Sequence, residues 1–377
     1  MLGFAGPVEA RAEPKNWHGF ALGGGELNFA PGIDNQLTGH GWIGFDSLGV
    51  GIVGRGNLRL FWNTTKAHVG VERIPFAKDK LAFFAFVEGE AFISQLLNDY
   101  FVRGQRINEF GIEASYVLLY TKLQWYPGKH QTIEIVAPVR YWWFGARSAT
   151  SSSFGLPANT WVFEPRIGYN YWKIDVPSDE WESHRVFQRI TGIAVGMQLG
   201  LDVRSDVRPW GLGDGRNDPG KVSYVISQRL RGGWALGRFV RLQLDQWGNY
   251  GWNQDDITRR RIGGASPYVI PVPGLPWTGL ISERLFAGQL GIHLRARETS
   301  QHEFGVLLAG GAFNDVARTG ALSTYGGAGG LAAFGDLRFG PTGRFQLDIR
   351  GSWGFPVRWL IESQYVSLLV GFGVRAF

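Results

Sequence analysis

Polar and apolar residues alternate with a period of two along many stretches of the chain. In the stretch 344–355 the odd positions are Phe345, Leu347, Ile349, Gly351, Trp353 and Phe355, and the even positions include Gln346, Asp348 and Arg350. The same alternation runs through 132–144, 160–173 and 187–204. Because successive side chains of a strand point to opposite faces, this pattern predicts β-strands with one apolar and one polar face.

The alternating stretches are long for soluble strands, which average about five or six residues. A tilted strand that crosses a membrane needs about nine to eleven. Sixteen strands are predicted: Trp17–Phe29, Gly39–Gly51, Gly56–Trp62, Ala67–Ile74, Leu81–Phe92, Phe110–Trp125, Gln131–Phe144, Thr160–Val176, Phe187–Arg204, Val222–Leu236, Arg238–Trp252, Ser282–Ala296, His302–Asn314, Tyr325–Phe339, Arg344–Phe355 and Tyr365–Phe377. An even number is expected for a bacterial single-chain barrel. The pattern changes phase near Tyr116, which predicts a β-bulge there.

The predicted connections alternate between short and long. Short turns such as 126–130 and 340–343 are interleaved with long loops such as 145–159, 205–221 and 253–281. Membrane barrels have short periplasmic turns and longer outer loops. This alternation predicts that both chain termini lie on the periplasmic side of a bacterial outer membrane.

The composition agrees with a membrane barrel. The chain has 55 Gly, and 14% of its residues are aromatic, whereas only 19% are charged, below the roughly 25% of soluble domains. Mean hydropathy is −0.09, and no run of 18 apolar residues predicts a membrane helix. The fold class predicted is therefore all-β, a transmembrane antiparallel β-barrel of about 16 strands; a soluble sandwich or propeller is the alternative.

Charged residues concentrate on the polar face of the predicted strands. In a membrane barrel this face points toward the lumen. A charge on the lipid-facing side would cost about 2–4 kcal/mol near the bilayer midplane. The residues predicted to face the lumen are Glu134, Arg140, Glu164, Arg166, Asp202, Arg204, Arg241, Asp245, His293, Arg295, Arg344, Asp348 and Arg350. Such a surface suits either a solvated pore wall or a set of ion pairs that brace a plugged lumen.

The two ends of the chain have different signals. Residues 1–16 are similar to the end of a secretory signal, with Ala10-Arg11-Ala12 as the cleavage pattern. Residues 17–377 then form a single barrel domain. The last strand places Val366, Leu368, Val370, Phe372 and Val374 on one face, which we expect to face lipid while the strand closes the barrel against the first one. The final residue, Phe377, falls on the opposite phase.

The long predicted loop 253–281 contains Arg261-Ile-Gly-Gly264 and the stretch Ser266–Trp277, and the strand Glu283–Arg295 follows it. These stretches resemble the Omp85 superfamily of BamA/TamA-like outer-membrane barrels. The stretches 326–330 and 340–350 are also similar to the last strands of that family. The resemblance implies a sixteen-stranded barrel whose sixth loop folds into the lumen. The residues it assigns to this luminal loop are Arg261, Gly263, Gly264, Pro273, Gly274 and Leu275.

The chain departs from the family at the loop tip. The family has an Arg-Gly-aromatic motif there, which pairs with an Asp on the thirteenth strand, whereas this chain has Pro273-Gly274-Leu275 and no acid in Val306–Phe313. Loss of both partners predicts a loop that is held in a different way, since one buried charge alone would be costly. No POTRA domain is predicted, so the family's protein-handling activity does not follow directly.

No residue pattern singles out an enzyme. The chain has no Cys, and its seven His show no metal-ligand or catalytic spacing. The stretch Gly213–Gly220 offers carboxylates for a weak Ca²⁺ site, but it lacks the spacing of an EF-hand, and we interpret it as an ordinary outer loop. We therefore predict no catalytic residues, no metal and no cofactor.

The predicted function is transport or insertion of a polypeptide or a lipid at the outer membrane, and a passive porin with an Arg-rich lumen is the alternative. A lipid-active enzyme is a third and weaker hypothesis. The expected partners are outer-membrane lipid, lipopolysaccharide and the barrel assembly machinery. No nucleic acid is expected, because the net charge of +6 is not concentrated beyond Arg259-Arg260-Arg261.

Overall fold

The computed structural model describes residues 18–30, 33–48, 53–61, 64–92, 100–102, 105–175, 191–262, 272, 280–295, 302–314, 325–339, 345–357 and 365–375. Nearly all of these residues are in β-strands, and one 3-10 turn, η1 (Asn108–Phe110), is present. Within these ranges no helix is long and apolar enough to cross a membrane. The predicted leader, residues 1–16, lies outside the described residues.

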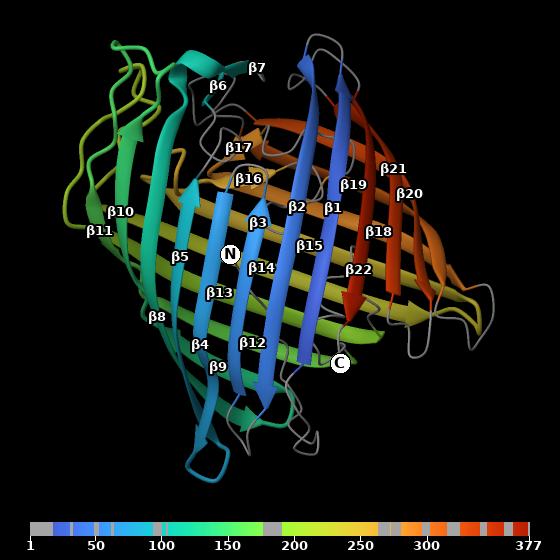
Figure 1. Cartoon of the computed structure of the whole chain (residues 1–377). Helices are drawn as coiled ribbons and strands as arrows, with labels where there is room; N and C mark the ends of the chain where they lie inside the picture. Colours follow the sequence, from blue (N-terminus) through green and yellow to red (C-terminus); the bar gives the residue numbers. More distant parts are fainter. Residues whose placement is uncertain are drawn as a thin grey trace.

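Eighteen strands form one continuous antiparallel sheet (Figure 1). Their bounds are β1 (His18–Ala30), β2 (Ile33–Leu48), β3 (Val53–Phe61), β4 (Thr64–Phe76), β5 (Leu81–Phe92), β8 (Ile112–Gly128), β9 (Gln131–Val136), β10 (Val139–Ala146), β11 (Thr160–Phe163), β12 (Arg166–Asp175), β13 (Thr191–Arg204), β14 (Val222–Ala235), β15 (Val240–Trp252), β18 (Arg284–Arg295), β19 (Glu303–Asn314), β20 (Tyr325–Phe339), β21 (Phe345–Val357) and β22 (Tyr365–Arg375).

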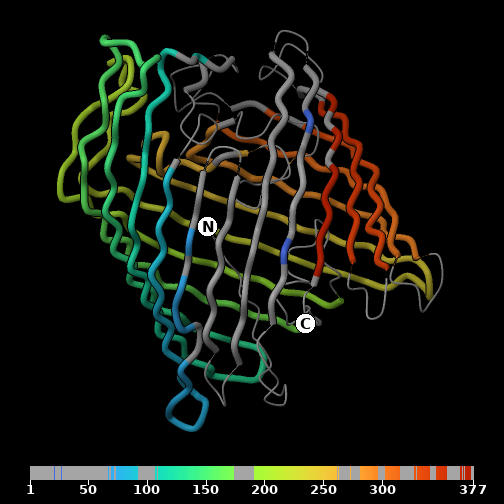
Figure 2. Tube along the Cα trace, in the orientation of Figure 1, coloured from blue at the N-terminus to red at the C-terminus, as the bar shows by residue number. Residues whose placement is uncertain are grey.

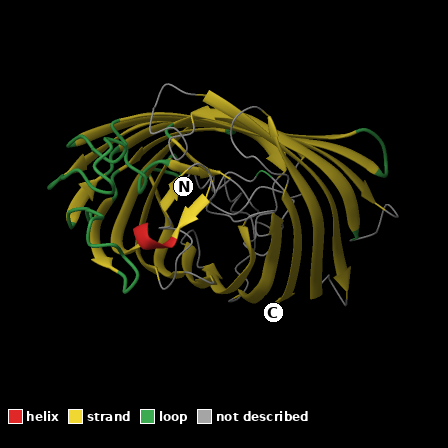
Figure 3. Cartoon of the chain, turned by 90° about the horizontal axis from the view of Figure 1, so that it is seen from above, coloured by secondary structure: helices red, strands yellow, loops and turns green. Residues whose placement is uncertain are grey.

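The sheet closes on itself. Strand β1 pairs with β2 on one side and with β22 on the other, from Phe20 opposite Arg375 to Phe29 opposite Val366. Seen from above, the strands surround an interior (Figure 3). Closure satisfies the backbone groups that an edge strand would expose to lipid. The predicted transmembrane antiparallel barrel is confirmed.

We name one passage of the chain along the barrel wall a wall span. Two prolines explain why the sheet has 18 strands but only 16 wall spans. The predicted strand 131–144 is divided at Pro138 into β9 and β10, and 160–176 is divided at Pro165 into β11 and β12. Proline has no N–H to donate to the ladder. Its carbonyl still accepts, since Glu164 N donates to Pro138 O at 2.9 Å and Leu201 N to Pro165 O at 3.1 Å. Each broken pair thus continues as one span, and 18 strands less two gives 16.

Several predicted details were wrong. Strand β2 begins at Ile33, well before the predicted Gly39, and two short hairpins inside long loops were not predicted: β6 (Tyr100–Val102) with β7 (Gln105–Ile107), and β16 (Arg260–Ile262) with β17 (Leu280–Ser282). The predicted bulge near Tyr116 is absent from β8, whose burial alternates without a break through this position. The register shift lies instead between Trp125 and Gly128.

Most outward side chains are apolar, and many remain exposed in the isolated chain. Leu199, Phe286, Leu308 and Val370 are 40–57% exposed, while the intervening inward positions are buried or half-buried. The terminal strand follows this rule, since Val366, Leu368, Phe372 and Val374 are also exposed. Its apolar set therefore faces outward as predicted; Phe377 lies outside the described residues.

Exposed aromatic residues mark both ends of the outward face. On β14, Tyr224 stands near one end and Trp234 near the other, and both are over 40% exposed. Ten residues at about 3.3 Å each span roughly 33 Å along the strand, or about 23 Å at a 45° tilt. This spacing matches the apolar band of about 25 Å between the aromatic girdles of membrane barrels.

The barrel has two different ends. Turns between neighbouring spans, such as Ala77–Lys80 below β4 and β5, lie at what we name the short-turn end (Figure 2). The connections 147–159, 205–221 and 253–259 lie at the opposite, long-loop end. The strand ends His18 of β1 and Arg375 of β22 both lie at the short-turn end, because β1 runs away from it and β22 runs toward it.

Candidate functional site

Ion pairs link neighbouring spans on the inner face of the barrel. Arg140 Nε lies 3.1 Å from Glu164 Oε1, and Arg166 binds Asp202 on β13. Ser223 on β14 donates to the other oxygen of Asp202 at 3.2 Å. Positive and negative groups alternate from β10 to β13, and Ser223 extends the contacts to β14, so they brace this part of the wall.

The segment Asn253–Ile262 leaves β15 and lies against this inner face. Ile257 packs against the apolar inner cluster of Tyr116, Leu118 and Trp142. Arg260, in β16, donates from Nε to Asn249 Oδ1 of β15 at 3.2 Å. The segment therefore lies inside the barrel at its long-loop end. We name it the luminal segment.

Asp255 joins the luminal segment to the barrel wall. Its carboxylate is fully buried and accepts two hydrogen bonds of 2.9 Å from Arg204, the last residue of β13. Trp210 Nε1 donates to it at 3.0 Å and Thr258 Oγ1 at 2.9 Å. A bidentate Arg–carboxylate pair with two further donors fixes both the position and the orientation of the segment.

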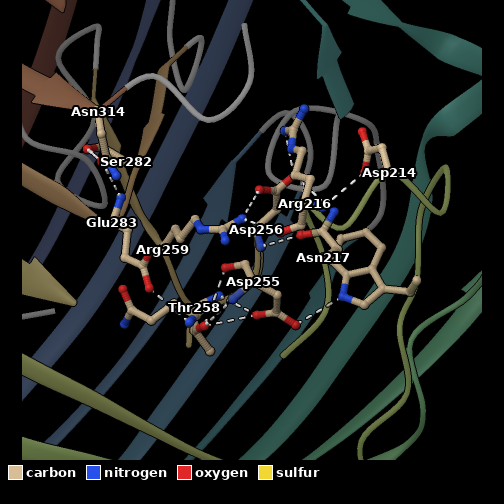
Figure 4. Close-up of polar contacts among 12 residues, drawn as sticks. Asp214, Arg216, Asn217, Asp255, Asp256, Thr258, Arg259, Ser282, Glu283 and Asn314 are labelled. Carbon is tan, nitrogen blue, oxygen red and sulfur yellow. Dashed lines mark hydrogen bonds and ion pairs between the residues drawn. The ribbon is translucent and has the colours of Figure 1, made fainter. Parts of the chain in front are cut away.

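The next residue, Asp256, joins the luminal segment to the long loop 205–221 (Figure 4). Arg216 Nη2 lies 2.5 Å from one oxygen and Arg259 Nη1 lies 3.0 Å from the other. The Asn217 amide donates to Asp256 and accepts from its backbone N at 2.9 Å. Asp255, Asp256 and the partners of both, Arg204, Trp210, Arg216, Asn217, Thr258 and Arg259, are named the luminal cluster.

The far end of the loop is fixed as well. Glu283 is fully buried, and its carboxylate accepts from Gln254 N at 3.1 Å. Its own backbone N donates to Asn314 Oδ1 of β19 at 3.0 Å. Arg260, Ile262, Leu280 and Ser282 pair in the β16–β17 hairpin. The two ends of the loop are thus held together and to the wall.

Burial by itself would raise the pKa of Asp255, because it disfavours the charged form. Attraction to Arg204 and hydrogen bonds from Arg204, Trp210 and Thr258 outweigh burial and hold this pKa well below its usual range. The carboxylate is therefore ionised at every pH at which the protein is expected to work.

Trypsin protection of Arg259, Arg260 and Arg261 is expected to be the same at pH 5 as at pH 7. A lowered pKa contributes stability that is fully present above the ordinary carboxyl value of about 3.9 and is lost only as pH falls through the folded-state value. The measurement is limited proteolysis of the purified protein at each pH, with the amount of trypsin adjusted to give equal activity on an unfolded substrate. Cleavage that begins at pH 5–6 would contradict this assignment.

The described residues that were predicted to face the lumen occupy inward positions of their strands, and they can be grouped by their contacts. Arg140, Glu164, Arg166 and Asp202 form the wall contacts above, and Arg204 reaches Asp255. Asp245 accepts from Arg229 at 2.9 and 2.5 Å. Nearer the short-turn end, His293 Nδ1 and Glu303 Oε1 are 2.8 Å apart. The others on the inward phase are Glu134, Arg241, Arg295, Asp348 and Arg350; Arg344 lies outside the described residues.

The loop residues assigned by resemblance are mostly beyond what the structure describes. Gly263, Gly264, Pro273, Gly274 and Leu275 lie outside the described residues, and Arg261 is placed only by its backbone in β16. The described part of the loop is held by an acid of the loop and an Arg of the wall. This polarity is opposite to the family pattern, in which the loop carries the Arg.

Sequence reasoning missed the luminal cluster. Asp255 and Arg204 are 51 residues apart, and Arg216 and Asn217 lay in a stretch interpreted as an ordinary outer loop. Asp214 in that stretch instead accepts from Arg216 N at 3.0 Å and shapes its own turn. The available signal was the run Asp255-Asp-Ile-Thr-Arg-Arg-Arg261, because six charged or hydroxyl residues in seven suggest a bound rather than a freely solvated loop.

The closed sheet, its outward apolar face and its two aromatic girdles define an outer-membrane β-barrel. Solved structures with similar folds agree. BamA from Haemophilus ducreyi lacking POTRA domains 1–3 has a TM-score of 0.60 at 10% identity, covering 96% of this chain and 71% of that one. CdiB from Acinetobacter baumannii has 0.59 at 10% identity, covering 94% and 60%. A bacterial polysaccharide outer membrane secretin has 0.51 at 6% identity, covering 97% and 100%.

These likenesses concern the fold. This chain spans less than two thirds of the length of CdiB. No protein family matches the sequence, and no curated protein sequence matches it.

Proposed function

We propose that this chain is an Omp85-like barrel of the bacterial outer membrane that transports or inserts a polypeptide or a lipid. The observation that carries the proposal is the luminal segment, which follows the eleventh wall span and is held inside the barrel by the buried luminal cluster. In this proposal both termini are periplasmic, the barrel assembly machinery inserts the chain, and lipopolysaccharide surrounds it. No catalytic step and no cofactor are part of it.

The luminal segment favours a gated barrel, whose lumen is closed until the segment moves, over a pore that is always open. Ion pairs with less than a tenth of their side-chain area exposed, such as Arg204 with Asp255 and Arg216 with Asp256, hold it in one place. A porin needs a continuous aqueous path, and a fixed luminal segment narrows such a path. The Omp85 resemblance places a luminal loop at the same point in the strand order.

A reconstituted insertion assay tests the proposal. Liposomes with and without the purified protein receive a urea-unfolded eight-stranded outer-membrane barrel, and folding is followed by its heat-modifiable electrophoretic mobility. We expect faster folding with the protein, and a return to the unassisted rate when residues 263–279 are replaced by a Gly-Ser linker. For a lipid substrate, the same vesicles report transbilayer movement of a fluorescent lipid. No effect on either reaction would remove the proposal.

The alternative is a passive porin. The inner face of β14, β15, β18, β20 and β21 favours it, since it carries Arg229, Arg231, Arg241, Arg295, Arg338 and Arg350. Planar bilayer recordings separate the two functions. Large, steady, anion-selective conductance of the wild-type protein would support the porin, whereas the gated barrel is expected to show little or none.

A further inference from the structure

An open apolar groove lies on the outward face of β15, β18, β19 and β20. Its floor is formed where Gly288, Gly310 and Gly329 stand opposite one another on three neighbouring strands, so that no side chain fills the space. Its walls include Leu290 and Leu308, and its volume is about 580 Å³. Since this face of the barrel contacts the bilayer, the groove is open to hydrocarbon.

A cation stands on the same outward face, toward the long-loop end. Arg284 is the first residue of β18, and its guanidinium lies 4.7 Å from the ring centre of Tyr250. Tyr250 in turn contacts Trp252, with ring centres 4.4 Å apart. Arg284 precedes Gly288 by four residues, or about 13 Å along the strand. The cation and aromatic rings thus lie at the membrane interface, above an apolar groove.

We propose that Arg284 and this groove bind a phosphorylated, multiply acylated glycolipid of the lipid A type. The guanidinium binds a phosphate of the headgroup, for which its planar set of donors is suited. Tyr250 and Trp252 lie beside the sugar, and two of the acyl chains occupy the groove. This site is independent of what passes through the lumen; it requires only that the long-loop end faces outward, as the connection lengths predict.

The groove shape favours a lipid with several chains. It extends over four strands, which lie about 4.8 Å apart, so it is about 14 Å wide. That width exceeds a single hydrocarbon chain and suits neighbouring chains that leave one headgroup. Two chains fill the groove for either lipid, but only lipid A has a sugar that can lie against Tyr250 and Trp252. Lipid A should therefore be preferred over phosphatidylglycerol, although both carry phosphate.

Native mass spectrometry of the full-length protein in detergent tests the site, with hexa-acylated diphosphoryl lipid A and phosphatidylglycerol as separate probes. Arg284→Gln removes the charge and is expected to weaken lipid A binding about tenfold, the value of one charge-assisted hydrogen bond. Gly288→Leu fills the groove, and its Cβ would meet nothing nearer than Asp245 O at 3.5 Å. It should weaken lipid A binding several-fold while Arg284 is intact.

Two matched variants control for folding and general surface effects. Gly351→Leu adds the same side chain to the outward face of β21, where a Cβ meets nothing within 4 Å. Arg238→Gln removes an exposed Arg at the short-turn end. Both are expected to bind lipid A like the wild type, and heat-modifiable mobility checks that all four variants are folded. Equal binding of lipid A by all variants, or equal retention of phosphatidylglycerol and lipid A by the wild type, would overturn the proposal.

Discussion

Replacing Asp255 by alanine is expected to release the luminal segment from the barrel wall. The change leaves the Arg204 guanidinium buried without its bidentate partner, and it removes the acceptor of Trp210 and Thr258. Breaking a buried ion pair in this way costs about 3–5 kcal/mol. Because the strands keep their own ladder, we expect the loss to appear as local opening of the segment and not as unfolding of the barrel.

Two measurements can detect this local opening of the luminal segment. Trypsin should cleave at Arg259–Arg261 in the variant and not in the wild type, since Arg259 is only 5% exposed in the folded chain. Planar bilayers should show a higher or more frequently open conductance. Far-ultraviolet circular dichroism and heat-modifiable mobility should be unchanged, which separates opening from misfolding.

Two control variants change residues of the luminal segment, its wall partner or the neighbouring loop 205–221. Asp214→Ala removes an acid that only caps its own turn, so it should change neither readout. The double variant Arg204→Met with Asp255→Leu removes both charges and should restore most of the trypsin protection, because an apolar pair avoids the unpaired charge. If Asp255→Ala were as protected as the wild type, the luminal cluster would not be what holds the segment.

The strands could be predicted from the sequence because lipid imposes a strict rule on one face. At Leu199, Phe286 or Val370 a polar residue would be costly, so the period of two survives in almost every wall span. The same rule does not apply to the lumen. Tyr116 and Leu118 are apolar yet face inward, where they pack with Trp142. Apolar residues on the inward face gave the pattern an apparent change of phase near Tyr116, which led to the wrong prediction of a bulge.

The site could not be predicted to the same extent, because its contacts join distant segments. Asp256 and Arg216 come from two different loops, and three-residue strands such as β16 and β17 are too short to carry a periodic signal. Pro138 and Pro165 also show a limit of local patterns. Each interrupts its own strand, yet the two interruptions face each other, so the wall continues.

Replacing Leu199 by arginine is expected to destabilise the barrel in the membrane. Leu199 lies near the middle of β13, on the outward face, and is 53% exposed in the isolated chain. A charge costs about 2–4 kcal/mol at the bilayer midplane and about 0–1 kcal/mol near the interface. Leu199 lies opposite Ile226, between the midplane and the level of Tyr224, so we expect a loss of about 2 kcal/mol. Urea titration of the protein refolded in liposomes should show this loss in the free energy of unfolding.

The neighbouring residue gives the control. Gln198 has the opposite phase and faces the lumen, where charged residues are already numerous, so Gln198→Arg should change stability by less than about 1 kcal/mol. The difference between two adjacent positions depends on which face meets lipid and not on the size or charge of the new side chain. Equal losses for the two variants would contradict the assignment of the outward face to the membrane. A loss confined to Leu199→Arg would show that the apolar positions of the alternating pattern are the ones that contact lipid.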